Sequence, residues 1–186
     1  MQNTQKVQGS LNTSNGSFNQ TTEVLNKSSH ETTISRAEVD LALETWGSNL
    51  VSISKTFRAG EDYQKTASEL IKKTYNYEIG PVLFKPTLAS VITFRNTFEG
   101  ALSYFVAGNS DYTEDRGFAL NPWEKVNFEI AGVVLAKDHA IVMGNKLLSD
   151  ITGRITKANF TMGFIRDENG KLKINLHHSS LPYLPA

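Results

Sequence analysis

The sequence predicts an α+β fold, in which helices come first and an antiparallel meander of strands follows. Residues 36–75 space their apolar side chains as amphipathic helices do, whereas residues 124–180 contain four strand-like runs joined by short turns. Helices segregated from a run of strands are typical of this class. The simplest arrangement lays the long first helix across a curved sheet and leaves a cone-shaped cavity between them.

The first 30 residues differ sharply from the rest in composition, since 18 of them are Ser, Thr, Asn or Gln. Such a segment buries too little apolar surface to offset the entropy of ordering it, so residues 1–34 are predicted to be a disordered tail. Residues 35–186 are predicted to be a single folded domain. The tail lacks the apolar core of a secretory signal and the arginine of a transit peptide. The expected location is therefore cytoplasmic, with an organelle as the alternative if the tail is a transit remnant.

The folded domain is expected to begin at a capping box, because Ser35 and Glu38 have the Ser-x-x-Glu spacing that satisfies two backbone donors at a helix start. Apolar residues then recur in steps of four and three. They are Val39, Leu43, Trp46, Leu50, Ile53 and Phe57. This spacing predicts one long amphipathic helix that ends at Gly60.

Further elements follow from turn and cap signals. A second helix is expected at about 62–75, a short strand at 82–85, and a third helix capped by Thr97 and stopped at Gly108. The four long strands are expected at residues 126–136, 140–149, 155–166 and 172–180.

Composition narrows the function. Nineteen basic residues balance 19 acidic ones, which disfavours a nucleic-acid binder, and no apolar stretch approaches the ~20 residues that cross a bilayer. There is no Cys, and of four His only His177 and His178 lie in a predicted strand. Adjacent strand residues point to opposite faces, so these two do not chelate one ion from a regular strand. The sequence therefore predicts no metal and no cofactor.

The end of the last strand is the first polar candidate. Simple alternation places His178 and Ser180 on the apolar face, whereas a bulge or bend turns His177 and Ser179 there instead. A structural hydrogen-bonded corner is the alternative reading. The sequence alone leaves these possibilities open.

Two other segments carry polar groups beside aromatic ones. Phe84, Lys85 and Thr87 lie where a strand ends in a proline turn, and Tyr104 and Phe105 lie on the short third helix. Such residues are also common in ordinary turns and cores.

Five stretches, taken together and in order, resemble a known family. They are residues 80–89 (GPVLFKPTLA), 100–106 (GALSYFV), 114–123 (EDRGFALNPW), 143–145 (MGN) and 176–182 (LHHSSLP). They resemble the iota-class carbonic anhydrases of bacteria, cyanobacteria and algae. That class is related to the calcium/calmodulin-dependent kinase association domain, within the nuclear-transport-factor-2-like (NTF2-like, or cystatin-like) superfamily. The similarity covers residues 36–184, essentially the whole predicted domain.

The resemblance implies an NTF2-like cone and an enzyme that reversibly hydrates CO2 to bicarbonate and a proton, without a metal, through hydroxyl groups and His. The family's pocket threonine looks like Thr87 and its tyrosine like Tyr104. Its serine and histidine lie within residues 177–180, where the resemblance favours His177 and Ser179 as catalytic residues over His178 and Ser180. Some members end the strand with three His, but here Leu176 takes the first place. That departure disfavours a metal-dependent mechanism.

The remaining substrate contacts are expected from two sets of residues. Apolar walls for CO2 are expected from Trp46, Phe84 and Phe105. Polar contacts are expected from Lys85, His178 and Ser180. Hydroxyl groups are expected to orient the attacking water, and a His with a pKa of ~6.5 to relay the released proton.

Two other functions remain possible from sequence. An isomerase or cyclase on the same fold needs an acid in the cavity, for which Glu78, Glu99 and Asp115 are the nearby choices. A non-enzymatic oligomerisation or small-ligand-binding module is the other. A homodimer is expected in any case, because residues 133–135 and 141–143 are apolar on both faces of the sheet.

Overall fold

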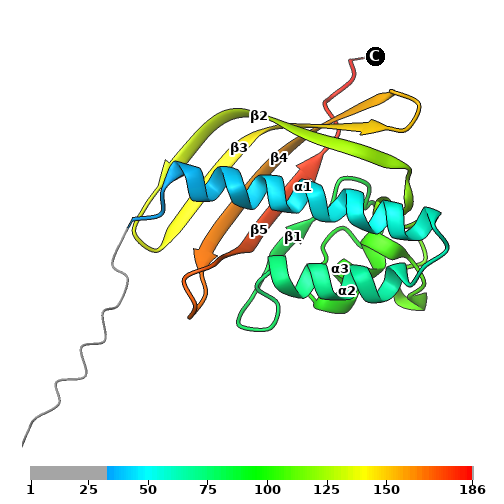
Figure 1. The fold of residues 1–186 in the computed structure, drawn as a ribbon, viewed down its shortest axis with the longest axis horizontal. Coiled ribbons are helices and arrows are strands. Elements are labelled where there is room, and N and C mark those ends of the chain that lie inside the picture. The colour runs from blue at the N-terminus through cyan, green and yellow to red at the C-terminus, as the bar shows by residue number, and fades with distance from the viewer. Residues whose placement is uncertain (1–32, 186) are drawn as a thin grey trace, which may run out of the picture.

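The computed structural model describes residues 33–185 (Figure 1). The predictions made for the tail, and for the location that depends on it, lie outside the described residues. Helices pack on one face of a five-stranded sheet, so the α+β class is confirmed.

Helix α1, Arg36–Arg58, starts as its capping residues predict. The Ser35 hydroxyl accepts a hydrogen bond from the Glu38 amide at 3.3 Å, and the Glu38 carboxylate accepts one from the Ser35 amide at 2.8 Å. The buried face of the helix includes Val39, Leu43, Trp46, Leu50 and Ile53, as its spacing requires. The chain leaves the helix through Gly60, whose φ of +72° favours glycine.

Two shorter helices gather at the β1 end of the sheet (Figure 1). Helix α2 spans Tyr63–Thr74 and helix α3 spans Phe98–Val106. Their N-caps are Asp62 and Thr97, whose side chains accept hydrogen bonds from the first turn. Two 3-10 turns, η1 (Ser110–Tyr112) and η2 (Phe118–Leu120), connect α3 to the main sheet.

The sheet has the strand order β1-β5-β4-β3-β2. The strands are β1 (Leu83–Lys85), β2 (Trp123–Leu135), β3 (His139–Asp150), β4 (Ile155–Arg166) and β5 (Leu172–Ser180). Four of them form the expected antiparallel meander. The short β1 instead pairs in parallel with β5, which corrects the expectation of a wholly antiparallel sheet. Between β1 and β5 the chain passes through α3, the two 3-10 turns and strands β2, β3 and β4, and β5 then lies beside β1 in the same direction.

A bulge in β5 decides which of its residues face the helices. Ile174 pairs with Phe164 on β4, but Leu176 pairs with Gly163, so Asn175 is the extra residue between them. An extra residue reverses the alternation of faces beyond it. Because of it, His177 and Ser179 are buried on the face that carries Ile174, whereas His178 is exposed.

The opposite face of the sheet carries no helix within residues 33–185, and apolar side chains are exposed there. Val134, Ile141 and Met143 are among them. The structure contains, in its described part, no helix long and apolar enough to cross a membrane.

Candidate active site

Buried hydroxyl groups meet where β1 ends beside β5. Pro86 turns the chain after β1 and places Thr87 against Ser179. The Thr87 hydroxyl donates to the Ser179 hydroxyl at 2.8 Å, and the Ser179 hydroxyl donates to the Asn159 carbonyl at 3.0 Å. With these directions, the Thr87 oxygen retains lone pairs that can accept another hydrogen bond.

Tyr104 brings a third hydroxyl, from α3. The side chain is 5% exposed, yet its hydroxyl has no hydrogen-bond partner in the structure. Burial raises the pKa of this phenol well above its usual value. The Thr87 side chain and the backbone of Thr87 and Leu88 lie close enough to oppose that rise, but none is in hydrogen-bonding geometry. Tyr104 is therefore a neutral donor with unused capacity.

Aromatic rings fill the space in which a cone-shaped cavity was expected. Phe84 stacks on His177 with ring centroids 4.8 Å apart, and meets Tyr104 edge-on at 5.7 Å. Phe105 stacks on Phe84 at 6.0 Å, and Phe118 stacks on Tyr104 at 5.4 Å. The site is thus enclosed in apolar surface, which strengthens any electrostatic interaction inside it.

A second set of polar groups forms a row across the interior. The Trp46 indole nitrogen, on α1, donates to the Tyr75 hydroxyl at 2.9 Å. The same hydroxyl lies 2.7 Å from Nδ1 of His177. On the far side of the imidazole, Nε2 lies 3.4 Å from the amine of Lys146.

Lys146 is a residue of this site that the sequence pattern did not single out. It is 1% exposed, and within residues 33–185 no carboxylate forms an ion pair with it. Its amine lies 4.6 Å from the centre of the Trp46 ring and 5.9 Å from that of Phe118. Burial lowers the pKa of Lys146 to about 7. A signal did exist, because alternation along β3 places Lys146 on the same face as the buried Val142 and Leu148.

His177 is neutral at this site. Burial, and secondarily the nearby basic groups of Lys146 and His178, hold its pKa well below the usual value. The expectation of an imidazole that titrates near neutrality therefore does not hold, because desolvation disfavours the charged ring.

The structure brings seven of the ten predicted site residues together and leaves three outside. Those in the interior are Trp46, Phe84, Thr87, Tyr104, Phe105, His177 and Ser179.

The other three, Lys85, His178 and Ser180, do not reach that interior. His178 and Ser180 line a hollow of about 320 Å³ on the opposite face of the sheet. Lys85 is half-buried at the sheet edge and donates to the Ser179 backbone carbonyl at 3.0 Å. The bulge at Asn175 and the parity of β1 explain this placement.

A buried ionic cluster fixes the loop that carries Thr87 and the helix that carries Tyr104. Arg95 contacts Asp115 at 2.8 Å and Glu114 at 3.4 Å. Asp115 also accepts from the Ser103 hydroxyl at 2.7 Å, next to Tyr104. The cluster thereby links the loop after β1, which contains Thr87, to helix α3.

The acids named for an isomerase are not available inside the site. Asp115 is engaged by Arg95 and Ser103, while Glu78 and Glu99 are exposed. No group of three His, Cys, Asp or Glu side chains able to hold a metal ion occurs in residues 33–185.

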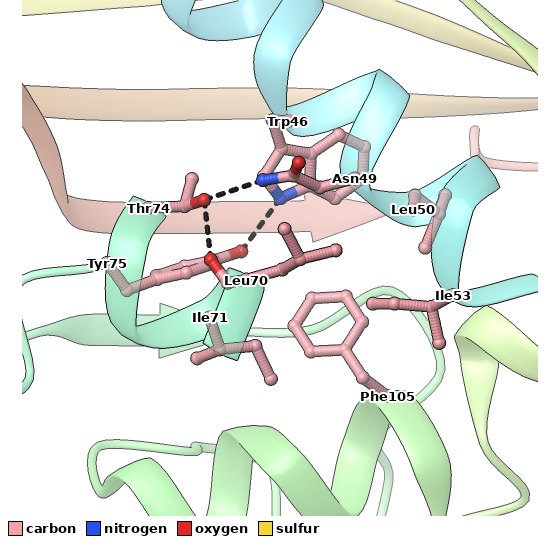
Figure 2. A pocket seen from close by; sticks show the side chains of 9 residues that line it. All are labelled: Trp46, Asn49, Leu50, Ile53, Leu70, Ile71, Thr74, Tyr75 and Phe105. Atoms are coloured by element: carbon pink, nitrogen blue, oxygen red, sulfur yellow. Dashed lines mark hydrogen bonds between the residues drawn. The ribbon is translucent and has the colours of Figure 1, made fainter. Parts of the chain in front are cut away.

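A small cavity between α1 and α2 approaches the site from outside. It has a volume of about 20 Å³, which is room for about one water molecule. Figure 2 shows the Trp46–Tyr75 hydrogen bond at this cavity, beside a second one from Asn49 to Thr74 of 2.8 Å. Its other walls are mostly apolar and include Leu50, Ile71 and Phe105.

Comparisons with known proteins show which family the chain matches. Residues 37–181 match the family described as metal-independent carbonic anhydrase. A metal-independent carbonic anhydrase from Nostoc sp. is 46% identical over 153 residues, which are 81% of this chain and 75% of that protein. The crystal structure of an iota-carbonic anhydrase from a cyanobacterium, complexed with bicarbonate, has a TM-score of 0.80 at 43% identity, over 82% of this chain and 95% of that one.

A more distant structure supports the fold alone. The putative calcium/calmodulin-dependent protein kinase II association domain from Xanthomonas campestris has a TM-score of 0.50 at 18% identity, over 78% of this chain and 86% of that one.

Proposed function

Since the chain belongs to the metal-independent carbonic anhydrase family, we propose that the interior formed by Thr87, Tyr104, His177 and Ser179 is where it hydrates CO2 to bicarbonate. The observation that carries this assignment is the Tyr104 hydroxyl, which is buried without a partner beside two further hydroxyl groups. Buried polar groups are nearly always satisfied, so this donor is suited to an oxygen-bearing ligand. Bicarbonate and its precursors supply such oxygens.

The hydroxyl groups have complementary roles in this reaction. The Thr87 oxygen can accept a hydrogen bond from the attacking water, which orients a water lone pair towards the carbon of CO2. Tyr104 can donate to the CO2 oxygen on which negative charge develops. The Ser179 hydroxyl donates its hydrogen bond to the Asn159 carbonyl, so its oxygen accepts the hydrogen bond from Thr87 and holds Thr87 in position.

The apolar rings favour CO2 as the other reactant. CO2 has no net dipole and enters an apolar site without losing hydrogen bonds to water. Phe84 and Phe105 provide this wall directly beside the hydroxyl groups.

Removing single hydroxyl groups tests the assignment. Tyr104→Phe and Thr87→Val should each lower CO2 hydration, measured by stopped flow, by ~10²–10³-fold, the scale for losing one well-placed donor. Tyr183→Phe is the matched control, since Tyr183 is 86% exposed, and should retain full activity. Full activity in both interior variants, with unchanged folding by circular dichroism, would show that the reaction does not take place at this site.

The same assay decides the metal question. We expect activity to persist after chelator treatment in protein whose metal content is measured by mass spectrometry. Activity that disappears with the chelator and returns with zinc would instead establish a metal-dependent enzyme.

We also propose that the enzyme is a homodimer joined through the helix-free face of the sheet. Val134 and Met143 are 61% and 56% exposed there, on neighbouring strands. A second copy is the occupant we favour, because an isologous pairing covers this apolar face on both protomers at once. Light scattering should give twice the mass of the chain, and Met143→Lys should shift it towards the monomer. A monomeric wild-type protein at micromolar concentration would exclude the proposal.

A further inference from the structure

The hydroxyl groups leave open which group takes the proton from the attacking water. The row formed by Trp46, Tyr75, His177 and Lys146 bears on this question. We infer that the Lys146 side chain is an uncharged amine at the end of an ordered hydrogen-bond row and is the proton acceptor of the reaction. This inference rests on the proposed function and adds a base to it.

Trp46 sets the direction of the hydrogen bonds in the row. An indole N–H can only donate, so the Tyr75 oxygen receives this hydrogen bond. The Tyr75 proton then needs an acceptor, and in the described part of the chain Nδ1 of His177 is the one in reach, at 2.7 Å. If Nδ1 carried a proton instead, the buried Tyr75 hydroxyl proton would have no partner. Tyr75 therefore donates and Nδ1 accepts.

The tautomer of His177 follows from that direction. A neutral imidazole carries one proton, so with Nδ1 as acceptor the proton is on Nε2. Nε2 faces the Lys146 amine at 3.4 Å. An ammonium group has no lone pair and would set a donor against a donor, whereas an uncharged amine completes the row as its final acceptor.

The surroundings of Lys146 agree with this assignment. Two other members of the row are titratable, namely His177 on β5 and Tyr75 in the helical layer, and Tyr104 lies near Tyr75. All three side chains are neutral. Apart from Nε2 of His177, the contacts that the structure shows to the amine within residues 33–185 are with the faces of two aromatic rings, Trp46 and Phe118. Burial without a counter-ion lowers the pKa of Lys146 to about 7, close to the working pH that suits a general base.

Ring contacts connect Lys146 to the part of the interior that holds the hydroxyl groups. Its amine lies over Phe118, which stacks on Tyr104, and next to His177, which stacks on Phe84. The 3.4 Å contact to Nε2 is long for a hydrogen bond, so the lone pair is readily turned towards a water molecule.

The step is balanced without any other reagent. The water oxygen forms a bond to the carbon of CO2 while one water proton moves to the Lys146 nitrogen, giving bicarbonate and an ammonium group. The ammonium charge arises beside the new anion and stabilises it. After bicarbonate leaves, the ammonium releases its proton through water to the bulk solvent, which regenerates the amine for the next turnover.

Nitrogen NMR tests the protonation order without reference to activity. On 15N-labelled protein at pH 8, His177 should show a pyridine-type Nδ1 and a pyrrole-type Nε2, and the Lys146 resonance should be that of an amine. A protonated Nδ1, or a Lys146 that remains ammonium at pH 8, would overturn the inference.

Kinetics tests the role of that amine as a base. Wild-type kcat/KM for CO2 hydration should rise with pH through about 7, where Lys146 loses its proton. Lys146→Met should lose this rise and lower kcat/KM by ~10²-fold or more, the scale for a general base. Lys125→Met, a change at an exposed lysine on β2, should leave both the rate and the pH profile unchanged.

Chemical rescue separates a base from a merely structural side chain. Methylamine should restore part of the activity of Lys146→Ala, because a small amine can occupy the space and accept the proton. An unchanged pH profile in Lys146→Met, or no rescue of a folded Lys146→Ala, would exclude the base. If the wild type hydrates no CO2 at all, the proposed function fails instead, and the NMR result still decides the protonation order.

Discussion

Arg95 and Lys146 are both fully buried basic side chains, but their surroundings differ in kind. Arg95 has Asp115 and Glu114 as counter-ions and also donates to the Ile92 carbonyl. Lys146 has a neutral imidazole and two aromatic faces. A buried charge is stable only when it is paired, so the paired residue stays charged and holds structure. The unpaired one can lose its proton, which is what proton transfer requires.

The loop held by Arg95 shows what a paired cation does. Besides pairing with Arg95, the Glu114 carboxylate accepts from the backbone amides of Ser90, Val91 and Ile92. These amides, that of Val91 foremost, hold the pKa of Glu114 at about 2. The cluster keeps a loop with exposed apolar side chains in one conformation and so keeps Thr87 against Ser179.

The largest effect is expected at the paired cation. Arg95→Met should lower the free energy of unfolding by about 3–5 kcal/mol, because it leaves the buried Asp115 carboxylate without its counter-ion. Urea denaturation at pH 7.5 measures the change. A loss below about 1 kcal/mol would show that Arg95 is no more structural than Lys146.

Lys146, unlike Arg95, should cost folding stability when it is charged, so the free energy of unfolding should depend on pH. The folded-state pKa of Lys146 is about 7, below its value of 10.5 in the unfolded chain, so between these values the unfolded chain binds more protons. Stability should therefore rise with pH from about 7 towards 10, by up to about 1.4 kcal/mol per unit, and fall again as pH is lowered through that window.

Lys146→Met should abolish this rise and should not destabilise the fold at pH 7.5, since a volume-matched apolar side chain replaces a costly one. Urea unfolding of both proteins at pH 7.5, 8.5 and 9.5 provides the test. Parallel pH dependences in the two proteins would mean that Lys146 has a counter-ion.

The smallest effect is expected where a basic side chain is in water. Arg154 pairs with Asp150 at 3.2 Å, but its side chain is 72% exposed. Arg154→Ala should change the free energy of unfolding by about 1 kcal/mol or less, because solvent screens such pairs. An effect comparable to that of Arg95→Met would break the link between burial and structural role.

Local signals in the sequence determined most of the elements. The capping box at Ser35 and Glu38, the N-cap at Thr97 and the strands at 155–166 and 172–180 appear where they were predicted. These features depend on hydrogen bonds and side-chain spacing within a few residues, which is why a single sequence reveals them. The number and spacing of the His residues also disfavour a three-His zinc site. There are four His, and the two that lie on a predicted strand are adjacent, so too few ligands share one face.

Three features depended on contacts between distant segments and were decided by tertiary structure alone. The parallel pairing of β1 with β5 joins two strands that are separated along the chain by α3 and three other strands. The bulge at Asn175, which turns His177 and Ser179 inward, appears only when β5 is registered against β4. The protonation of Lys146 depends on Trp46, Tyr75 and His177, which come from other segments of the chain. A lysine on a strand is ordinarily solvated, and only the surroundings brought together by the fold remove the water that would keep it charged.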